Sequence, residues 1–226
     1  MIKACIFDLD GVLCDTAKYH YLAWKRLADE LGFVFTEKDN ERLKGVSRME
    51  SLEILLEVGN ITAGEEQKEE WARKKNGWYV EYLKSMDQEA LLPGAKEMLL
   101  LARRDGIKTA LGSASKNAGL ILDRLGMAPY FDAIADGNLV ERAKPAPDVF
   151  LAGARLTQTP PQDCLVFEDS QAGIAAARAG RMASVGVGDK KILGEADFVV
   201  GSLAELTGPD GEGTGLWRKI SAGVSV

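Results

Sequence analysis

The chain begins with a short run of apolar residues that ends where acidic residues follow. Residues 2–7 are almost entirely apolar, and Asp8-Leu9-Asp10-Gly11 comes directly after them. A short, nearly continuous apolar run that stops at a turn is typical of a buried strand in a parallel sheet. The pattern therefore predicts a first strand that carries carboxylates at its C-terminal end.

A helical pattern replaces the strand pattern between residues 15 and 88. Apolar residues recur at every fourth position from Ala23 to Leu31, after a potential N-cap at Thr16 and before a stop at Gly32. Three further charge-rich segments have a helical period, and they lie at residues 36–44, 48–58 and 63–84. No strand candidate interrupts this block, so we expect it to be all-helical.

Beyond residue 88, short apolar runs alternate with helical segments. The predicted strands are residues 107–111, 131–135, 164–167, 183–187 and 198–200. The predicted helices are residues 95–105, 116–125, 147–156 and 171–179. Repeated strand–helix units imply a parallel sheet with helices on both faces.

We therefore expect an α/β fold in which residues 2–7 join that sheet. A Rossmann-like core domain would comprise residues 1–14 and 89–226. Residues 15–88 would form an all-helical cap domain, inserted after the first strand. The tail after residue 207 has no clear period, and we expect loop there with a short helix near Leu216.

Composition and charge narrow the class of protein. The 226 residues are 46% apolar and 27% charged, which is typical of a folded globular chain. The net charge of -6 leaves no general basic face for nucleic acid or for an anionic membrane. Because His20 is the single histidine, a multi-histidine zinc centre is excluded. We expect a monomer that acts on a small molecule.

The cysteines indicate a reducing compartment. Cys5, Cys14 and Cys164 form no C-x-x-C pair, and an odd number does not suit a disulfide framework. The N-terminal apolar run is too short for a signal peptide, and no segment reaches the roughly 18 apolar residues of a membrane span. We therefore expect a cytoplasmic location.

Polar residues with catalytic potential lie at the ends of the predicted elements. Ligands of open parallel sheets bind at the carboxyl ends of the strands, so we expect these residues to share one edge. They are Asp8 and Asp10 after the first strand, Ser113-Ala114-Ser115-Lys116-Asn117 after the second, Lys144 before the 147–156 helix, and Glu168-Asp169 after the fourth strand.

This set of side chains favours phosphoryl transfer. Four carboxylates in one pocket repel one another unless a hard cation lies between them, which indicates an oxygen-ligated Mg²⁺. Lys144, Ser113 and backbone N–H groups at a helix start would supply hydrogen-bond donors for a phosphoryl group. A carboxylate aimed at that group can attack it as a nucleophile, and Asp10 can transfer the proton.

Each motif alone allows another explanation. The two aspartates after the first strand can belong to a turn, and Glu168-Asp169 can be a helix N-cap. The segment from Ser113 to Lys116 matches the S-x-x-K of serine acyl-transfer enzymes, but their S-D-N and K-T-G motifs are missing. No G-x-x-x-x-G-K-[ST] phosphate loop is present either. The agreement of several strand ends favours phosphoryl transfer.

The sequence resembles the haloacid dehalogenase superfamily, and within it the β-phosphoglucomutase family, to about residue 206. The superfamily motifs are Phe7-Asp8-Leu9-Asp10-Gly11-Val12, Ser113, Lys144-Pro145-Ala146-Pro147-Asp148 and Glu168-Asp169-Ser170. The further matches are Asp15-Thr16-Ala17-x-x-His20, Trp24-Lys25, Lys44-Gly45-Val46-Ser47-Arg48, Ser113-Ala114-Ser115-Lys116-Asn117 and Asp169-Ser170-Gln171-Ala172-Gly173-Ile174. A helical cap after the first strand is also a feature of that family.

The resemblance implies a role for each matched residue of the core. Asp8 would be the phosphorylated nucleophile, and Asp10 the general acid/base, whose backbone carbonyl would also bind the metal. Glu168 and Asp169 would complete the Mg²⁺ ligands together with Asp8. The transferring phosphate would be held by Ser113, the Ala114 N–H and Lys144, whose bond to Pro145 is expected to be cis, as in relatives.

The matched cap residues would bind the rest of a sugar bisphosphate. The distal phosphate would be bound by Arg48 with help from Ser115, Lys116 and Asn117. His20 would couple cap closure to the position of Asp10, with Thr16 as a neighbouring hinge or orienting hydroxyl. Gly45 and Trp24 belong to the substrate-binding set, although a role in the cap core is favoured for Trp24. Apart from the resemblance, a solvated helix start would explain Arg48, and simple packing would explain His20.

The resemblance implies a Mg²⁺-dependent phosphomutase that interconverts β-glucose 1-phosphate and glucose 6-phosphate. The reaction would pass through glucose 1,6-bisphosphate and an aspartyl phosphate at Asp8. A sugar-phosphate phosphatase is the alternative, with the same core residues and a leakier cap. A non-enzymatic phospho-acceptor module, which is a different class of protein, would leave the helical insert without a purpose.

Overall fold

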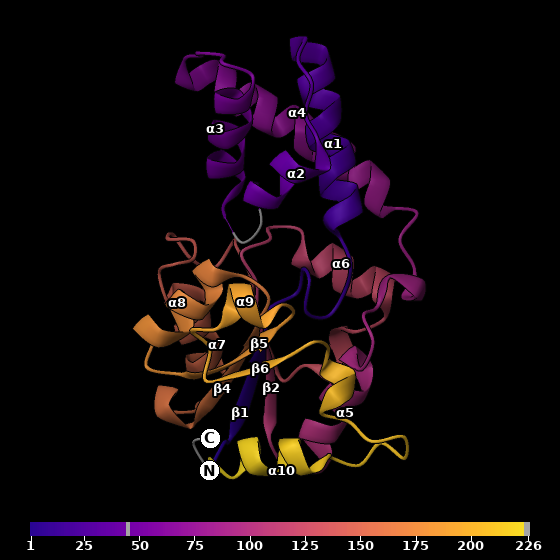
Figure 1. Ribbon diagram of the computed structural model, residues 1–226, viewed down its shortest axis with the longest axis vertical. Coiled ribbons are helices and arrows are strands. Elements are labelled where there is room, and N and C mark those ends of the chain that lie inside the picture. Colours follow the sequence, from indigo (N-terminus) through magenta and orange to yellow (C-terminus); the bar gives the residue numbers. More distant parts are fainter. Residues whose placement is uncertain (44–45, 224–226) are drawn as a thin grey trace.

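Six parallel strands form the sheet of the computed structural model, which describes residues 1–43 and 46–223. They are β1 (Ala4–Phe7), β2 (Lys108–Gly112), β3 (Ala133–Ala135), β4 (Cys164–Glu168), β5 (Ala183–Val187) and β6 (Phe198–Val200). Their order in the sheet is β3-β2-β1-β4-β5-β6 (Figure 1). The predicted Rossmann-like sheet is confirmed, and its order reverses between the neighbouring strands β1 and β4.

The central strand β1 shows why the sheet needs helices on both faces. Every residue of β1 is buried, and successive side chains of a strand point to opposite faces. Phe7 belongs to the apolar layer under α5 (Ala95–Arg104), α6 (Ala118–Leu125) and α10 (Gly215–Ser221), and its ring stacks on Phe167 of β4 at 4.6 Å. Ile6 belongs to the opposite layer, under α7 (Asp148–Leu156) and α8 (Gln171–Ala179).

The α-helices that follow β1, as far as residue 83, form an all-helical cap over the sheet (Figure 1). They are α1 (Ala17–Leu31), α2 (Glu37–Asn40), α3 (Arg48–Val58) and α4 (Glu65–Leu83). These helices share an apolar cluster of their own, which includes Trp24, Leu27, Leu52 and Leu55. The cap therefore has a separate small core, whereas the domain limits at residues 14/15 and 88/89 stay a prediction.

Two short helices differ from the sequence-based expectation for local reasons. The predicted 36–44 helix is only one turn long, because α2 starts at a capping box between Thr36 and Asp39 and a 3₁₀ turn follows it as far as Leu43. The helix α9 (Lys190–Leu193) was not predicted, since a single turn is too short for a periodic pattern. The short helix expected near Leu216 is confirmed as α10.

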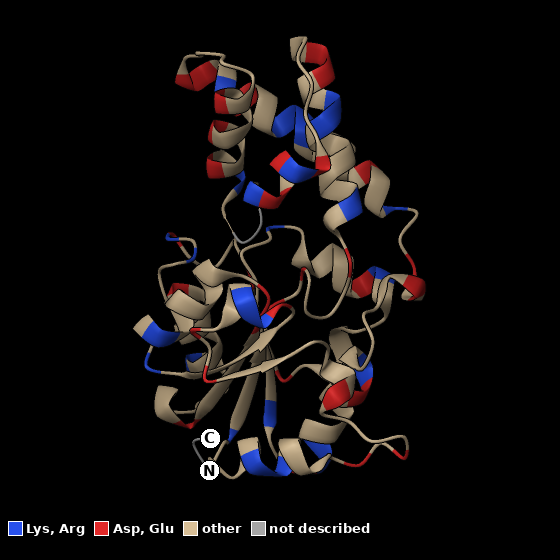
Figure 2. Cartoon of the chain, in the orientation of Figure 1, with Lys and Arg blue, Asp and Glu red and all other residues tan. Residues whose placement is uncertain are grey.

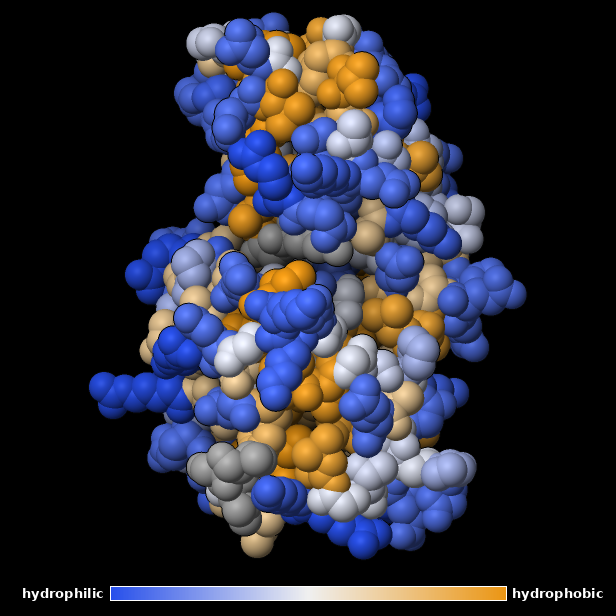
Figure 3. Space-filling view, viewed as in Figure 1, coloured by the Kyte–Doolittle hydropathy of each residue, from blue (hydrophilic) through white to orange (hydrophobic). Residues whose placement is uncertain are grey.

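The surface is largely charged and polar. Figure 2 shows acidic and basic residues interspersed over the cap helices, as on solvated faces. Figure 3 shows mostly hydrophilic side chains on the visible face, whose outline narrows between the cap and the sheet. Over residues 1–43 and 46–223, no helix has the length and apolar content needed to cross a membrane.

Candidate active site

A cavity of about 780 Å³ lies between the cap helices and the carboxyl ends of the strands. The sequence-predicted residues that line it are Asp8, Asp10, Thr16, His20, Trp24, Arg48, Ser113, Ala114, Ser115, Lys116, Asn117, Lys144 and Asp169. Glu168 is fully buried beside Lys144, and Gly45 lies outside the described residues. The cavity is located where the strand order reverses, as expected for the ligand site of an open parallel sheet.

Three carboxylates converge at the ends of β1 and β4. One oxygen each of Asp8, Glu168 and Asp169 lies within 4.8 Å of the others. Burial and the neighbouring acids Glu168 and Asp10 raise the pKa of Asp8 to about 7, although Lys144 opposes the shift. Burial and the same kind of repulsion raise the pKa of Asp169 to about 8. An oxygen-ligated divalent cation would remove this repulsion, so the donor set fits Mg²⁺.

Lys144 partly balances these carboxylates. Its ammonium is fully buried and lies 2.8 Å from Asp8 Oδ1 and 2.7 Å from Glu168 Oε2. Burial works against the charge, but the two carboxylates outweigh it and raise the pKa of Lys144 above its ordinary value. The Lys144–Pro145 peptide bond is cis, as expected. Lys144 is therefore held as a cation beside Asp8.

Two glycines make room for the acidic cluster. Gly11 has a φ of 78°, and a Cβ there would lie 2.0 Å from Asp169 Oδ2. At Gly173, in the first turn of α8, a Cβ would lie 1.9 Å from the carboxyl carbon of Glu168. A side chain at either position would displace a proposed metal ligand. Both glycines stand in the quoted motifs, but only the structure assigns them this steric role.

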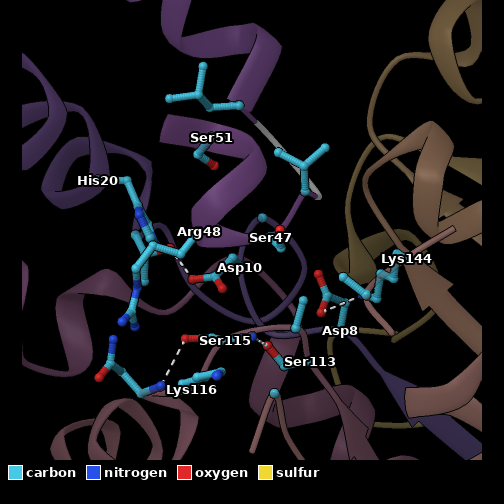
Figure 4. A pocket seen from close by; sticks show the side chains of 18 of the residues that line it. Asp8, Asp10, His20, Ser47, Arg48, Ser51, Ser113, Ser115, Lys116 and Lys144 are labelled. Carbon is cyan, nitrogen blue, oxygen red and sulfur yellow. Dashed lines mark hydrogen bonds and ion pairs between the residues drawn. The ribbon is translucent and has the colours of Figure 1, made fainter. Parts of the chain in front are cut away.

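Asp10 is separated from the cluster and faces the cap. The Thr16 hydroxyl donates a hydrogen bond to Asp10 Oδ1. Figure 4 shows Asp10 between the pair formed by Asp8 and Lys144 and the side chain of Arg48. Thr16 occupies the predicted N-cap position of α1, but its side chain makes no capping hydrogen bond. The expected orienting hydroxyl is thus in contact with Asp10.

The loop after β2 is ordered by its own hydroxyls at the other end of the cavity. The Ser115 N–H donates to Ser113 Oγ at 3.1 Å, and the Asn117 N–H donates to Ser115 Oγ at 3.2 Å. Lys116 is exposed between them. The loop leads directly into α6, so polar side chains and the start of a helix face the cavity together.

Arg48 approaches the same end of the cavity from the cap. It is the first residue of α3, whose start is fixed by a capping box between Ser47 and Glu50. Figure 4 shows the Arg48 side chain directed toward the side on which Ser115 and Lys116 lie. Within the described part of the chain, no carboxylate forms an ion pair with Arg48. A half-buried, unpaired guanidinium is suited to an anionic ligand.

Sequence reasoning missed Lys75, which lies in the cap wall of the cavity. Its side chain is 2% exposed, and its Nζ lies within hydrogen-bond distance of His20 Nδ1, at 3.0 Å. The ammonium also lies over the rings of Trp24, at 4.4 Å, and Tyr79, at 4.8 Å. The signal was the spacing of the buried α4 positions, because Lys75 shares their stripe with Ala72, Tyr79 and Leu83.

His20 and Trp24 are buried parts of the cap. The His20 ring packs on Tyr79 at 4.1 Å, and burial together with Lys75 lowers the pKa of His20 well below its usual value. Trp24 is 2% exposed and belongs to the apolar cluster of the cap, in agreement with the favoured role in its core. A coupling between His20 and the position of Asp10 stays a prediction.

The arrangement as a whole is suited to phosphoryl transfer. The Asp8 carboxylate is paired with a lysine and belongs to a candidate cation site, and a second carboxylate, Asp10, is bound by a hydroxyl. Donors at the far end of the cavity could bind a second anionic group. Both the attack on phosphorus and the proton transfer can therefore be assigned to residues of one cavity.

Comparisons with known proteins identify the family. A family model described as haloacid dehalogenase-like hydrolase matches residues 2–181. The chain is 42% identical over 208 residues to the β-phosphoglucomutase of Bacillus subtilis (strain 168). The aligned region covers 91% of this chain and 92% of that protein. It is 33% identical over 181 residues to the phosphorylated carbohydrates phosphatase of Thermotoga maritima, and this region covers 79% of this chain and 81% of that protein.

A solved structure agrees with the sequence relatives. The crystal structure of β-phosphoglucomutase from Clostridium difficile matches this chain with a TM-score of 0.89 at 42% identity. The match covers 98% of this chain and 97% of that chain, so it includes the cap as well as the sheet. The chain is therefore an enzyme of the haloacid dehalogenase-like hydrolase family.

Proposed function

We propose that this enzyme is a phosphomutase that interconverts β-glucose 1-phosphate and glucose 6-phosphate through glucose 1,6-bisphosphate. The observation that carries the proposal is that cationic and hydroxyl side chains occupy both sides of Asp10 (Figure 4). Lys144 lies beside Asp8 on one side, and Arg48 faces Ser115 and Lys116 on the other. A phosphatase needs only the first set, whereas a mutase must hold a second phosphate while the first reacts.

Asp8 is the proposed nucleophile and Asp10 the proposed general acid/base. An oxygen of Asp8 attacks the phosphorus, so that a new O–P bond forms while the P–O bond to the sugar breaks. Asp10 gives its proton to the departing sugar oxygen, and it takes a proton from the sugar hydroxyl that attacks the aspartyl phosphate in the reverse sense. Lys144, Ser113 and the Ala114 N–H bind the transferring phosphate.

The metal ligands in this proposal are Asp8, Glu168, Asp169 and the backbone carbonyl of Asp10. Bound Mg²⁺ would neutralise charge on the phosphate oxygens and align them with the nucleophile. The convergence of the Asp8, Glu168 and Asp169 carboxylates within 4.8 Å and the raised pKa values of Asp8 and Asp169 support this assignment.

Residues of the cap and of the loop after β2 complete the proposed cycle. Arg48, Ser115, Lys116 and Asn117 bind the phosphate that does not react, and Trp24 and Gly45 contribute to the sugar-binding part of the cavity. The bisphosphate turns over between the two transfers, so that each phosphate visits Asp8. Closure of the cap, residues 15–88, excludes water, because hydrolysis of the aspartyl phosphate would end the cycle.

The assay uses Mg²⁺, β-glucose 1-phosphate and a trace of glucose 1,6-bisphosphate, with glucose 6-phosphate and free phosphate measured in the same tube. We expect mainly glucose 6-phosphate. Asp8→Asn should abolish the product, and Arg48→Ala should raise the KM for β-glucose 1-phosphate much more than it changes acetyl phosphate hydrolysis. Free phosphate as the main product would contradict the mutase.

A sugar-phosphate phosphatase is the second candidate. It is supported by the Thermotoga maritima relative named phosphorylated carbohydrates phosphatase, which is 33% identical to this chain. The two activities share the chemistry at Asp8 and differ in whether water or a sugar hydroxyl accepts the phosphate. The ratio of free phosphate to glucose 6-phosphate in the same assay separates them.

A further inference from the structure

A direct hydrogen bond joins the cap to the sheet domain at the end of the cavity where Arg48 lies. The side-chain amide of Asn117, at the start of α6, donates to Asn76 Oδ1 on α4 at 2.9 Å. Both side chains are partly buried, and both residues line the cavity. The contact is thus a direct side-chain link between a cap helix and the start of α6 in the sheet domain.

The Asn117 side chain does not have the usual role of an N-cap residue. An asparagine at this position normally accepts a hydrogen bond from a backbone N–H of the first turn. No such side-chain hydrogen bond is made by Asn117. Asn76 therefore determines the direction of its amide. Because a carboxamide has two N–H donors, one is used by Asn76 and the other can serve an oxygen in the cavity.

A phosphate at this end of the cavity needs donors from both layers. Arg48 belongs to α3 of the cap, whereas Lys116 and Asn117 belong to the loop after β2. These groups can bind one phosphate together only at a suitable separation of cap and sheet. The bond between Asn76 and Asn117 spans that separation directly.

We propose that Asn76 is a positioning residue for the distal phosphate, an inference that rests on the proposed function. Its side-chain carbonyl fixes the amide of Asn117 and holds α4 near α6, where Arg48 and Lys116 reach the same phosphate. Its loss weakens the binding of substrates that carry a distal phosphate. The chemistry at Asp8 is unaffected, because Asn76 has no contact there.

The test is a double-mutant cycle with Asn76→Ala, Asn117→Ala and the double variant. Asn76→Ala is expected to raise the KM for β-glucose 1-phosphate about tenfold, the effect of one lost hydrogen bond to a charged ligand, with kcat within about twofold. The double variant should bind no more weakly than Asn117→Ala alone, because Asn76 acts through Asn117. Acetyl phosphate carries no second phosphate, so its Mg²⁺-dependent hydrolysis should be equal in the wild-type protein and in Asn76→Ala.

The matched control is Lys74→Ala on the same helix, since Lys74 pairs with Glu30 inside the cap and should leave both reactions unchanged. Additive losses in the double variant, or an equal loss with acetyl phosphate, would overturn the role of Asn76. If the wild-type enzyme only releases free phosphate from β-glucose 1-phosphate, the mutase proposal fails. The role of Asn76 is then decided by comparing the KM for this hydrolysis between the wild-type protein and the variants. If calorimetry shows that β-glucose 1-phosphate neither binds nor reacts, both proposals fall.

Discussion

Burial changes the chemistry of two basic residues in the cap. Lys75 belongs to a strongly charged helix, yet its ammonium is almost fully buried 3.0 Å from His20 Nδ1. Loss of hydration and the nearby Arg48 lower the pKa of Lys75 well below its ordinary value. Burial, Lys75 and Arg48 lower the pKa of His20 in the same way. Burial and these two basic neighbours therefore disfavour a proton on the imidazole.

This environment predicts the direction of a pH effect on stability. Because the pKa of His20 is lowered from 6.5 in the folded protein, the unfolded chain binds the extra proton first as the pH falls. The contribution of His20 to stability is therefore complete above pH 6.5 and is lost below it. We predict that the free energy of unfolding falls more between about pH 7.5 and about pH 5.5 in the wild-type protein than in His20→Gln.

Urea unfolding at the two pH values measures this difference, and NMR measures its cause. Since the chain has one histidine, the imidazole signals titrate without overlap. Lys75→Met should move the pKa of His20 back toward its ordinary value, whereas Lys74→Met, on the exposed side of α4, should not. An imidazole that titrates at or above pH 6.5 in the wild-type protein would refute the prediction.

At the scale of secondary structure, two cap helices begin at a threonine, and the two threonines act differently. Thr36 accepts a hydrogen bond from the Asp39 N–H and caps α2. Thr16 occupies the same position in α1 without capping it, and its hydroxyl donates to Asp10 instead. One threonine therefore stabilises a helix, and the other holds the proposed general acid/base.

Substitution should separate these roles. Thr36→Ala is predicted to lower the free energy of unfolding by about 1 kcal/mol and to leave kcat unchanged. Thr16→Val keeps the shape of the side chain but removes the donor to Asp10, so we predict a kcat about tenfold lower with little change in KM. Urea unfolding and steady-state kinetics of both variants provide the comparison. A wild-type kcat in Thr16→Val would show that the hydroxyl does not orient Asp10.

The elements differ in how well the sequence predicts them. The buried strands are identified by continuous apolar runs, and the parallel topology then places Asp8 and Glu168 at neighbouring strand ends. The one-turn helix α9 carries too little periodicity to be recognised. Lys75 was missed because a lysine in a charged helix is usually solvated. The contact between Asn76 and Asn117 joins residues 41 positions apart, so only tertiary structure shows it.

At the scale of the whole molecule, the site is divided between two layers. Asp8 and Lys144 belong to the sheet domain, and Arg48 belongs to the cap. The cavity between them, about 780 Å³, has the size of a pocket that binds a small molecule. A ligand with an anionic group at the distal end can therefore contact both layers at once, and part of its binding energy can hold the cap closed.

We predict that glucose 6-phosphate with Mg²⁺ lowers the radius of gyration measured by small-angle X-ray scattering. Arg48→Ala removes the cap side chain that is proposed to bind the distal phosphate. We expect no decrease in its radius of gyration at a ligand concentration at which calorimetry shows binding. Arg42→Ala is the control, because Arg42 pairs with Glu57 within the cap and should leave closure intact. A wild-type protein that binds the ligand without becoming more compact would contradict closure. A ligand closes the cap only if it binds the closed state more tightly than the open state. Closure in Arg48→Ala would therefore show that another cap residue binds the distal phosphate.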